Sequence, residues 1–266
     1  MATVARHDKR RQDELRDLKI TYDGLARVDG SARFAFGDTA ALASLSGPIE
    51  VRLASELPSK ATFEVLVRPL SNVPATESKS LAANIRSTLE PSLILTKNPR
   101  TLVQLVVQSL SPPSCSSLSL SAAMVNASSL AFLKASSVPM KGVVSAVAVG
   151  QLSNRTLVLD PNDDEEAARG GGIFAFMFAD GEGLQDSNSD CVWTSWKSTS
   201  GRYDENELLA ARELARTGAK EVYDAMRKSF ESTSAVVVVE TQNLQAKVES
   251  NEVKEEHSDD NDRMEI

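Results

Sequence analysis

The sequence is poor in cysteine, in aromatic residues and in targeting features, and each shortage argues against a class of protein. Its 266 residues include two cysteines, Cys115 and Cys191, which do not have the spacing of a metal-binding pair. Nothing points to an oxidising compartment, so we expect both to be reduced, buried thiols. The N-terminal segment lacks the apolar core of a secretory signal, and no apolar run approaches the length that spans a bilayer. We therefore expect neither a secreted nor a membrane-spanning protein.

The chain also has no excess of basic residues. Its net charge is −8, and most of this negative charge lies at the C-terminal end. Residues 240–266 hold nine acidic side chains against Lys247, Lys254 and Arg263, which leaves about −2 for the remaining chain. Bulk charge therefore cannot attract RNA, and any contact needs a local basic patch. The region 236–266 is too polar to form a core, so we predict a disordered acidic tail there. It is either simply solvated or binds a basic partner.

The N-terminal half shows the pattern of strands around one long helix. Alternating residues predict strands at 31–36 and 39–45, joined by the hairpin dipeptide Gly37-Asp38. Residues 46–48 break that run, so a separate strand is expected at 49–53. Two more strands, at 60–67 and 102–110, flank a helix at 77–95, in which Leu81, Ile85 and Leu89 share one face and Pro91 must cause a kink or a restart.

The C-terminal half begins with a helix of small residues and ends with a long one. The first covers 118–136, with Leu120, Met124, Ala127, Leu130 and Ala131 facing inward. The last starts near Asp204 and Glu207, which resemble a capping box, and carries an apolar stripe from Leu208 to Phe230. Strands are expected between them at 143–149, 156–159, 173–178 and 192–196. Interleaved strands and helices indicate an α+β, or mixed α/β, fold.

Five short motifs give the chain a family resemblance. They are GSxxFxxGDTxxLxxxxGPxE at 30–50, KATxEVxxRP at 60–69, PRT at 99–101, VPM at 138–140 and LVLDP at 157–161. In this order and spacing they resemble the RNase PH family, which includes phosphorolytic 3′→5′ exoribonucleases and the ring subunits of the RNA exosome. The similarity extends to about Glu231. It implies an RNase PH-type domain of two βαβ-like halves over residues 1–235.

The resemblance also predicts that the catalytic site is degenerate. Active members hold phosphate with a Gly-Thr-Arg-type motif at the start of the second helix, where this chain has LSLSA at 118–122. Ser119 and Ser121 can donate hydrogen bonds, but they cannot supply a guanidinium charge. Asp160 matches the start of the family's acidic segment, whereas the later catalytic aspartate falls near Gly170. We therefore expect no catalytic residue, no metal and no cofactor, with Ser119, Ser121 and Asp160 as remnants of the site.

Two further features near this site have alternative interpretations. The acidic run at 163–166 is either a divalent-metal site or a solvated loop or helix start. Gly170-Gly171-Gly172 lacks the lysine and hydroxyl of a phosphate-binding loop, so we interpret it as an irregular join into the next strand. The charged residues 1–19 are expected to be loose, and Lys9-Arg10-Arg11 is either a nuclear import patch or a solvated turn.

Basic residues on loops and element ends are the candidates for RNA contact. Few aromatic residues lie near them, so contact would be to the RNA backbone and independent of sequence. Each is equally interpretable as a surface charge in a salt bridge. The candidates are Lys60, Arg68, Lys79, Arg86 and Arg100.

The resemblance implies a structural, non-catalytic subunit of the exosome core ring that supports 3′→5′ processing and decay of ribosomal, messenger and other RNAs. The implied partners are other RNase PH-like chains in a hetero-hexamer, S1/KH-type cap subunits, associated hydrolytic exoribonucleases and RNA, with no membrane. The implied locations are nucleus, nucleolus and cytoplasm. Two alternatives stay open: an active phosphorolytic exoribonuclease, and a homodimeric nucleic-acid-binding protein outside the ring.

Overall fold

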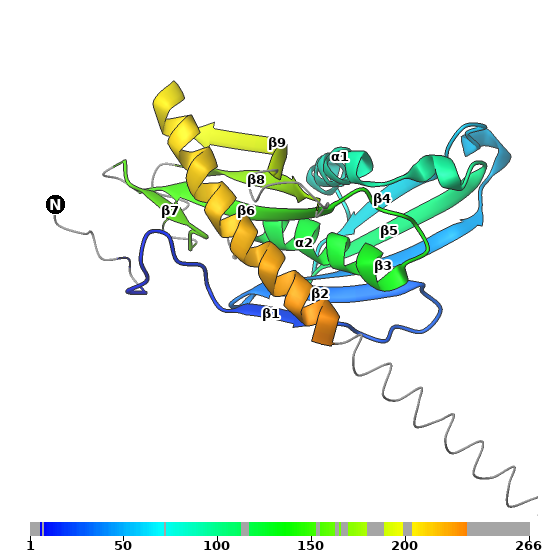
Figure 1. Cartoon of the computed structure of the whole chain (residues 1–266), viewed down its shortest axis with the longest axis horizontal. Helices are drawn as coiled ribbons and strands as arrows, with labels where there is room; N and C mark the ends of the chain where they lie inside the picture. Colours follow the sequence, from blue (N-terminus) through cyan, green and yellow to red (C-terminus); the bar gives the residue numbers. More distant parts are fainter. Residues whose placement is uncertain are drawn as a thin grey trace, which may run out of the picture. The chain divides into compact units, whose positions relative to one another are not determined.

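The computed structural model describes residues 6, 8–71, 73–112, 117–152, 155–162, 165, 170–179, 189–198 and 204–232. In this part of the chain two β-sheets and three α-helices form the mixed α/β fold that the sequence predicts (Figure 1). The acidic tail at 236–266, Cys115 and most of the acidic run at 163–166 lie outside the described residues.

The first sheet has five strands in the order β1-β2-β3-β5-β4. All neighbours are antiparallel except β4 and β5, which run parallel and are joined by helix α1. A parallel pair needs such a crossover, so β4, α1 and β5 form a βαβ unit. The elements are β1 (Leu18–Thr21), β2 (Gly30–Phe36), β3 (Thr39–Glu50), the 3₁₀ turn η1 (Leu53–Ser55), β4 (Thr62–Arg68), α1 (Thr76–Leu89), the 3₁₀ turns η2 (Glu90–Ser92) and η3 (Leu95–Lys97), and β5 (Thr101–Ser109).

The hairpin predicted at Gly37-Asp38 is confirmed, with Gly37 at a φ of +57° where a side chain would be strained. The separate strand predicted at 49–53 is wrong, because β3 continues to Glu50. An irregularity between Ser46 and Ile49 absorbs the residues that cannot join the ladder, and pairing with β5 then resumes. Pro91 acts as predicted: α1 ends at Leu89 and η2 contains the proline.

The second sheet has four antiparallel strands in the order β7-β6-β8-β9. They are β6 (Val143–Gln151), β7 (Leu157–Leu159), β8 (Gly170–Phe178) and β9 (Ser189–Ser198). The three glycines at 170–172 open β8 and are not an irregular join, which corrects the prediction. A Cβ on Gly171 would lie 2.4 Å from the carbonyl oxygen of Val149, so glycine allows the close approach of β6. Cys191 on β9 is a free, half-buried thiol.

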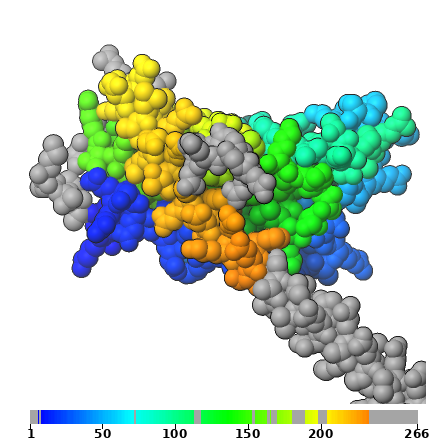
Figure 2. All heavy atoms as spheres, in the orientation of Figure 1, coloured from blue at the N-terminus to red at the C-terminus, as the bar shows by residue number. Residues whose placement is uncertain are grey.

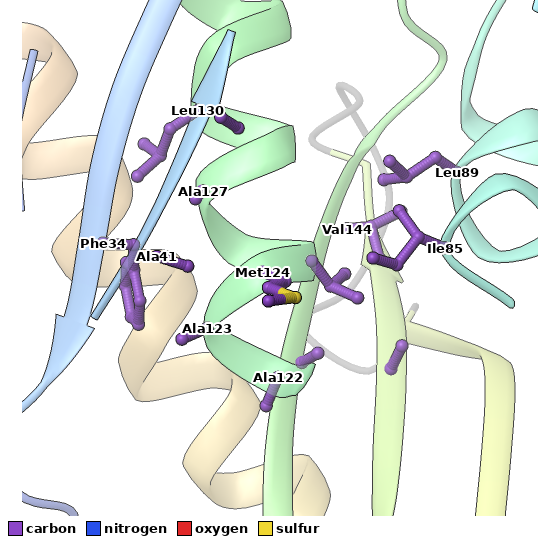
Figure 3. Packing of buried hydrophobic residues seen from close by; sticks show 14 of the residues in the cluster. Phe34, Ala41, Ile85, Leu89, Ala122, Ala123, Met124, Ala127, Leu130 and Val144 are labelled. Atoms are coloured by element: carbon purple, nitrogen blue, oxygen red, sulfur yellow. The ribbon is translucent and has the colours of Figure 1, made fainter. Parts of the chain in front are cut away.

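Helix α2 (Ser117–Ala135) lies between the two sheets and forms the centre of the core (Figure 3). One side of the helix faces Phe34 and Ala41 of the first sheet, and the other faces Val144 of the second. Met124, Ala127, Leu130 and Ala131 are buried as predicted, whereas Leu120 is only half-buried. By length and composition residues Leu118–Ala135 could span a membrane, which the sequence analysis did not expect, but the burial of α2 is that of a core helix.

The last helix covers residues 205–232, and up to Met226 it belongs to the same compact unit as the sheets. It packs on the four-stranded sheet: Ser145 Oγ donates a hydrogen bond to Ala219 O at 2.9 Å, and Phe178 stacks on Tyr223 with ring centroids 4.9 Å apart. Residues 227–232 are the described part of a second unit, in which the helix continues and Arg227 pairs with Glu231 at 3.1 Å.

Candidate functional site

Asp160 follows β7 directly and is the centre of a buried polar cluster. Its residue exposure is 1%, and both carboxylate oxygens are occupied. Arg16 donates to Oδ2 from Nε at 2.6 Å and to Oδ1 from Nη2 at 2.5 Å. Ser119 Oγ, on the first turn of α2, donates to Oδ1 at 2.8 Å. The fold thus brings together Ser119 and Asp160, two of the three predicted remnants. The third, Ser121, lies two residues further along α2 and is half-buried.

Two more arginines of the N-terminal segment complete the cluster. The side chain of Arg6 is fully buried and forms a bidentate pair with Glu165, with distances of 3.0 and 2.8 Å. Arg10 lies 3.6 Å from Asp160 Oδ2 and 2.5 Å from Asp8 Oδ2. Burial raises the pKa of Asp8, but the hydrogen bonds and charges of Arg10 and the charge of Arg6 outweigh this effect, so its pKa lies below its usual value of 3.8.

For the described residues of the N-terminal segment, this cluster corrects the expectation that they are loose. Lys9 and Arg11 are exposed, as in the predicted solvated turn, whereas Arg10 turns into the cluster. Arg6 and Arg16 are fixed against residues about 150 positions later in the chain. The sequence contained one unused signal: a buried aspartate at a strand end needs a cationic partner.

The charges within the cluster balance. Three guanidiniums face the carboxylates of Asp8, Asp160 and Glu165, so the described residues of the cluster leave no positive charge uncompensated for a phosphate dianion. No group of three or more potential metal ligands occurs among the described residues. Among the described residues, this arrangement is a buried salt-bridge network.

Three of the five candidates for RNA contact are paired with carboxylates. Lys60 Nζ lies 2.7 Å from Glu90, and Arg86 Nε lies 3.9 Å from the same residue. Arg100 Nε lies 3.4 Å from Glu56. For these three side chains the structure agrees with the alternative interpretation as surface salt bridges, which contribute little to stability and reduce the charge available to a ligand.

Arg68 and Lys79 differ, since neither forms an ion pair with a described residue and both line one surface pocket of about 550 Å³. We call it the Arg68–Lys79 pocket. A smaller pocket of about 190 Å³ shares Val67, Pro69 and Ser78 with it and extends to Leu120 and Met124. The complete lining of the larger pocket is Val65, Leu66, Val67, Arg68, Pro69, Pro74, Ser78, Lys79, Ala82 and Gln108.

Residues 14–137 match the model of the 3′ exoribonuclease family, domain 1, known as RNase PH. Across 235 residues the chain is 31% identical to "Exosome complex component Rrp41" of Archaeoglobus fulgidus, covering 85% of this chain and 86% of the relative. The chain belongs to the RNase PH family. It is also 32% identical over 162 residues to "Exosome complex exonuclease RRP46 homolog" of rice, where the match covers 61% of this chain and 66% of the relative, just under two thirds.

The crystal structure of rice Rrp46 has a similar RNase PH fold. The superposition has a TM-score of 0.73 at 26% identity and covers 85% of this chain and all of the rice chain. The RNase PH assignment made from short motifs is thus confirmed by both sequence and structure. Within this family, the Asp160 cluster occupies the segment in which the sequence analysis placed the degenerate catalytic site.

Proposed function

We propose that this protein is a non-catalytic subunit of an exosome core ring, which supports 3′→5′ processing and decay of RNA. The proposal extends the family membership and the names of the two relatives, both of which are exosome components. Its partners would be other RNase PH-like chains in a hetero-hexamer, S1/KH-type caps, hydrolytic exoribonucleases and RNA. It would act in the nucleus, nucleolus and cytoplasm.

The non-catalytic assignment rests mainly on Asp160, because both oxygens of its carboxylate already accept hydrogen bonds. Phosphorolysis must hold a phosphate dianion beside an RNA backbone, which requires uncompensated positive charge and a free acid. Here Arg16 and Ser119 occupy both oxygens of the aspartate, and the start of α2 supplies serines where the family's active members carry arginine. Neutral hydroxyl donors are roughly half as strong as charged ones.

The part of the molecule that would serve RNA is the Arg68–Lys79 pocket. Two cations that form no ion pair with a described residue attract a phosphate backbone, and their contact carries no base specificity. A ring subunit would thus guide RNA toward nucleases elsewhere in the assembly instead of cutting it.

A second candidate is an active phosphorolytic exoribonuclease. Two observations favour it: the rice relative is called an exosome complex exonuclease, and Ser119 still meets Asp160 at the start of α2. A third candidate, a homodimeric nucleic-acid-binding protein, would need no ring partner.

Two measurements test the proposal. The purified chain, given single-stranded RNA, Mg²⁺ and inorganic phosphate, should release no nucleoside diphosphate, and a tagged chain isolated from its host should carry other RNase PH-type chains. Diphosphate release that requires phosphate and stays with the protein through repurification would favour the enzyme. Recovery as a homodimer without ring subunits would favour the third candidate.

A further inference from the structure

The N-terminal segment joins the two sheets before it enters β1. We call its described residues, 6 and 8–16, the N-terminal strap. At one end Leu159 N–H donates to Gln12 O at 2.8 Å, so the strap lies along β7. At the other end Arg16 Nη1 donates to Thr39 Oγ1 at 3.1 Å at the start of β3. Figure 2 shows this segment in blue on the surface, although Arg6 itself is buried.

Arg6 is held by oxygens of the strap and by oxygens of β7 and the residues that follow it. Its Nη1 donates to Leu159 O at 2.9 Å, and its Nη2 donates to Asp160 O at 2.9 Å and to Glu165 Oε2 at 2.8 Å. The same Nη1 also contacts Arg11 O at 3.2 Å and Glu14 O at 3.4 Å within the strap. Four main-chain carbonyls and one carboxylate therefore surround a single guanidinium.

Such a cage of oxygens is unstable without a cation at its centre. The carbonyl dipoles and the carboxylate of Glu165 all direct negative charge inward, and the side chain of Glu165 is itself only 7% exposed. Leaving buried carbonyls and a carboxylate without donors is costly, and a planar fork of five N–H groups satisfies several of them at once.

We propose that Arg6 is the built-in cation of this oxygen cage and that it locks the N-terminal strap onto β7 and the segment that follows it. The strap opens and closes as a unit, because the arginine holds carbonyls of the strap and of β7 simultaneously. Closure keeps Arg16 on Asp160, so the strap also maintains the neutralised state of the family's acidic segment. This inference concerns folding and accessibility, and it stands whether or not the protein joins a ring.

The test uses the full chain with Arg6→Ala, Arg6→Lys and, as a matched control, Arg11→Ala. Arg11 has the same charge in the same strap, but it is exposed and its side chain forms no ion pair with a described residue. Breaking a buried charge pair should lower the melting temperature of Arg6→Ala by about 6–20 °C. The melting temperature of Arg6→Lys should lie between those of Arg6→Ala and the wild type, since lysine keeps the charge but lacks the planar fork of N–H donors. Arg11→Ala should stay within about 2 °C of the wild type, because surface substitutions change stability little.

Chemical rescue separates a cage from general destabilisation. Guanidinium chloride at a few millimolar should restore at least a third of the melting temperature lost in Arg6→Ala, whereas sodium chloride at equal ionic strength should not. The wild type should be unaffected at that concentration. Equal recovery with both salts, or a shift below about 2 °C in Arg6→Ala, would overturn the proposal.

A second readout applies if Arg6→Ala does not fold. Lys9 and Arg11 are exposed in the strap and are trypsin sites. Glu165→Gln keeps the shape of the cage and weakens its charge, so trypsin should cleave the strap about tenfold faster than in the wild type, as expected for a more populated open state. Unchanged cleavage in Glu165→Gln would show that the cage does not control the strap.

Discussion

Asn126 of α2 and Ala146 of β6 exchange two hydrogen bonds. The Asn126 amide donates to Ala146 O at 2.9 Å, and Ala146 N–H donates to Asn126 Oδ1 at 2.7 Å. One turn further along α2, Ser129 Oγ donates to Val144 O at 2.6 Å. Strand β7 pairs only with residues 149–151 of β6, so α2 supplies the hydrogen bonds that a neighbouring strand would otherwise provide.

Replacing this asparagine should therefore destabilise the protein strongly. Asn126→Ala leaves a buried N–H and a buried C=O without partners, at about 1–3 kcal/mol each. The matched control is Ser128→Ala, because Ser128 is equally buried but bonds only within its own helix, to Met124 O at 2.7 Å. Urea denaturation should show a loss of about 2–5 kcal/mol for Asn126→Ala and less than about 1 kcal/mol for the control. Equal losses would mean that the bonds to β6 do not matter.

A second prediction follows from the close packing of α2 on β2 at Gly30. A Cβ on Gly30 would lie 2.4 Å from the carbonyl oxygen of Ala131, and backbone atoms cannot move aside cheaply. Gly30→Ala should lower the free energy of unfolding by at least about 1–3 kcal/mol. Gly24→Ala is the control, because nothing lies within 4 Å of the added atom, and its stability should be unchanged or slightly higher. Thermal unfolding of both variants compares the two sites directly.

Most of the fold could be predicted because its signals are local. The hairpin at Gly37-Asp38, the apolar face of α1 and the small-residue helix α2 each follow from residues a few positions apart. The errors arose where neighbours decide the outcome. Pro48 does not end β3, because pairing with β5 resumes after an irregularity. Gly171 belongs to strand β8, and the close approach of β6 leaves no room for a side chain there.

The site was predictable in its residues but not in its contacts. The motif resemblance identified Ser119 and Asp160, and the structure brings them to 2.8 Å. The pairing of Arg6 with Glu165 joins residues 159 positions apart, and no local pattern specifies such a contact. In the same way, the sequence could not tell that Lys60 faces Glu90 while Arg68 has no ion-pair partner among the described residues.

A third prediction concerns the acidic C-terminal region, which the sequence analysis expects to contribute no core. Deleting residues 241–266 should change the melting temperature by less than about 2 °C, because a segment without buried apolar area adds little stability. Differential scanning calorimetry of the full and shortened chains checks this. A control shortened from residue 220 would remove the buried Val222 and Met226 and should unfold. A large drop for the first deletion would place the acidic region on the folded domain.

The last prediction separates the two cations of the pocket from the paired ones. Arg68→Ala and Lys79→Ala should each weaken binding of single-stranded RNA, with the double variant losing most, and each should reduce the slope of log K against log salt by about 0.7 per phosphate contact. Arg100→Ala is the matched control, since its guanidinium already lies 3.4 Å from Glu56 and is exposed. Fluorescence anisotropy with labelled oligonucleotides of two unrelated sequences, across a salt series, measures both quantities. The loss should be the same for both sequences, because phosphate contacts carry no base information. If Arg100→Ala weakens binding as much as the pocket variants do, the pocket has no special role, and the affinity for RNA depends only on the overall charge of the protein.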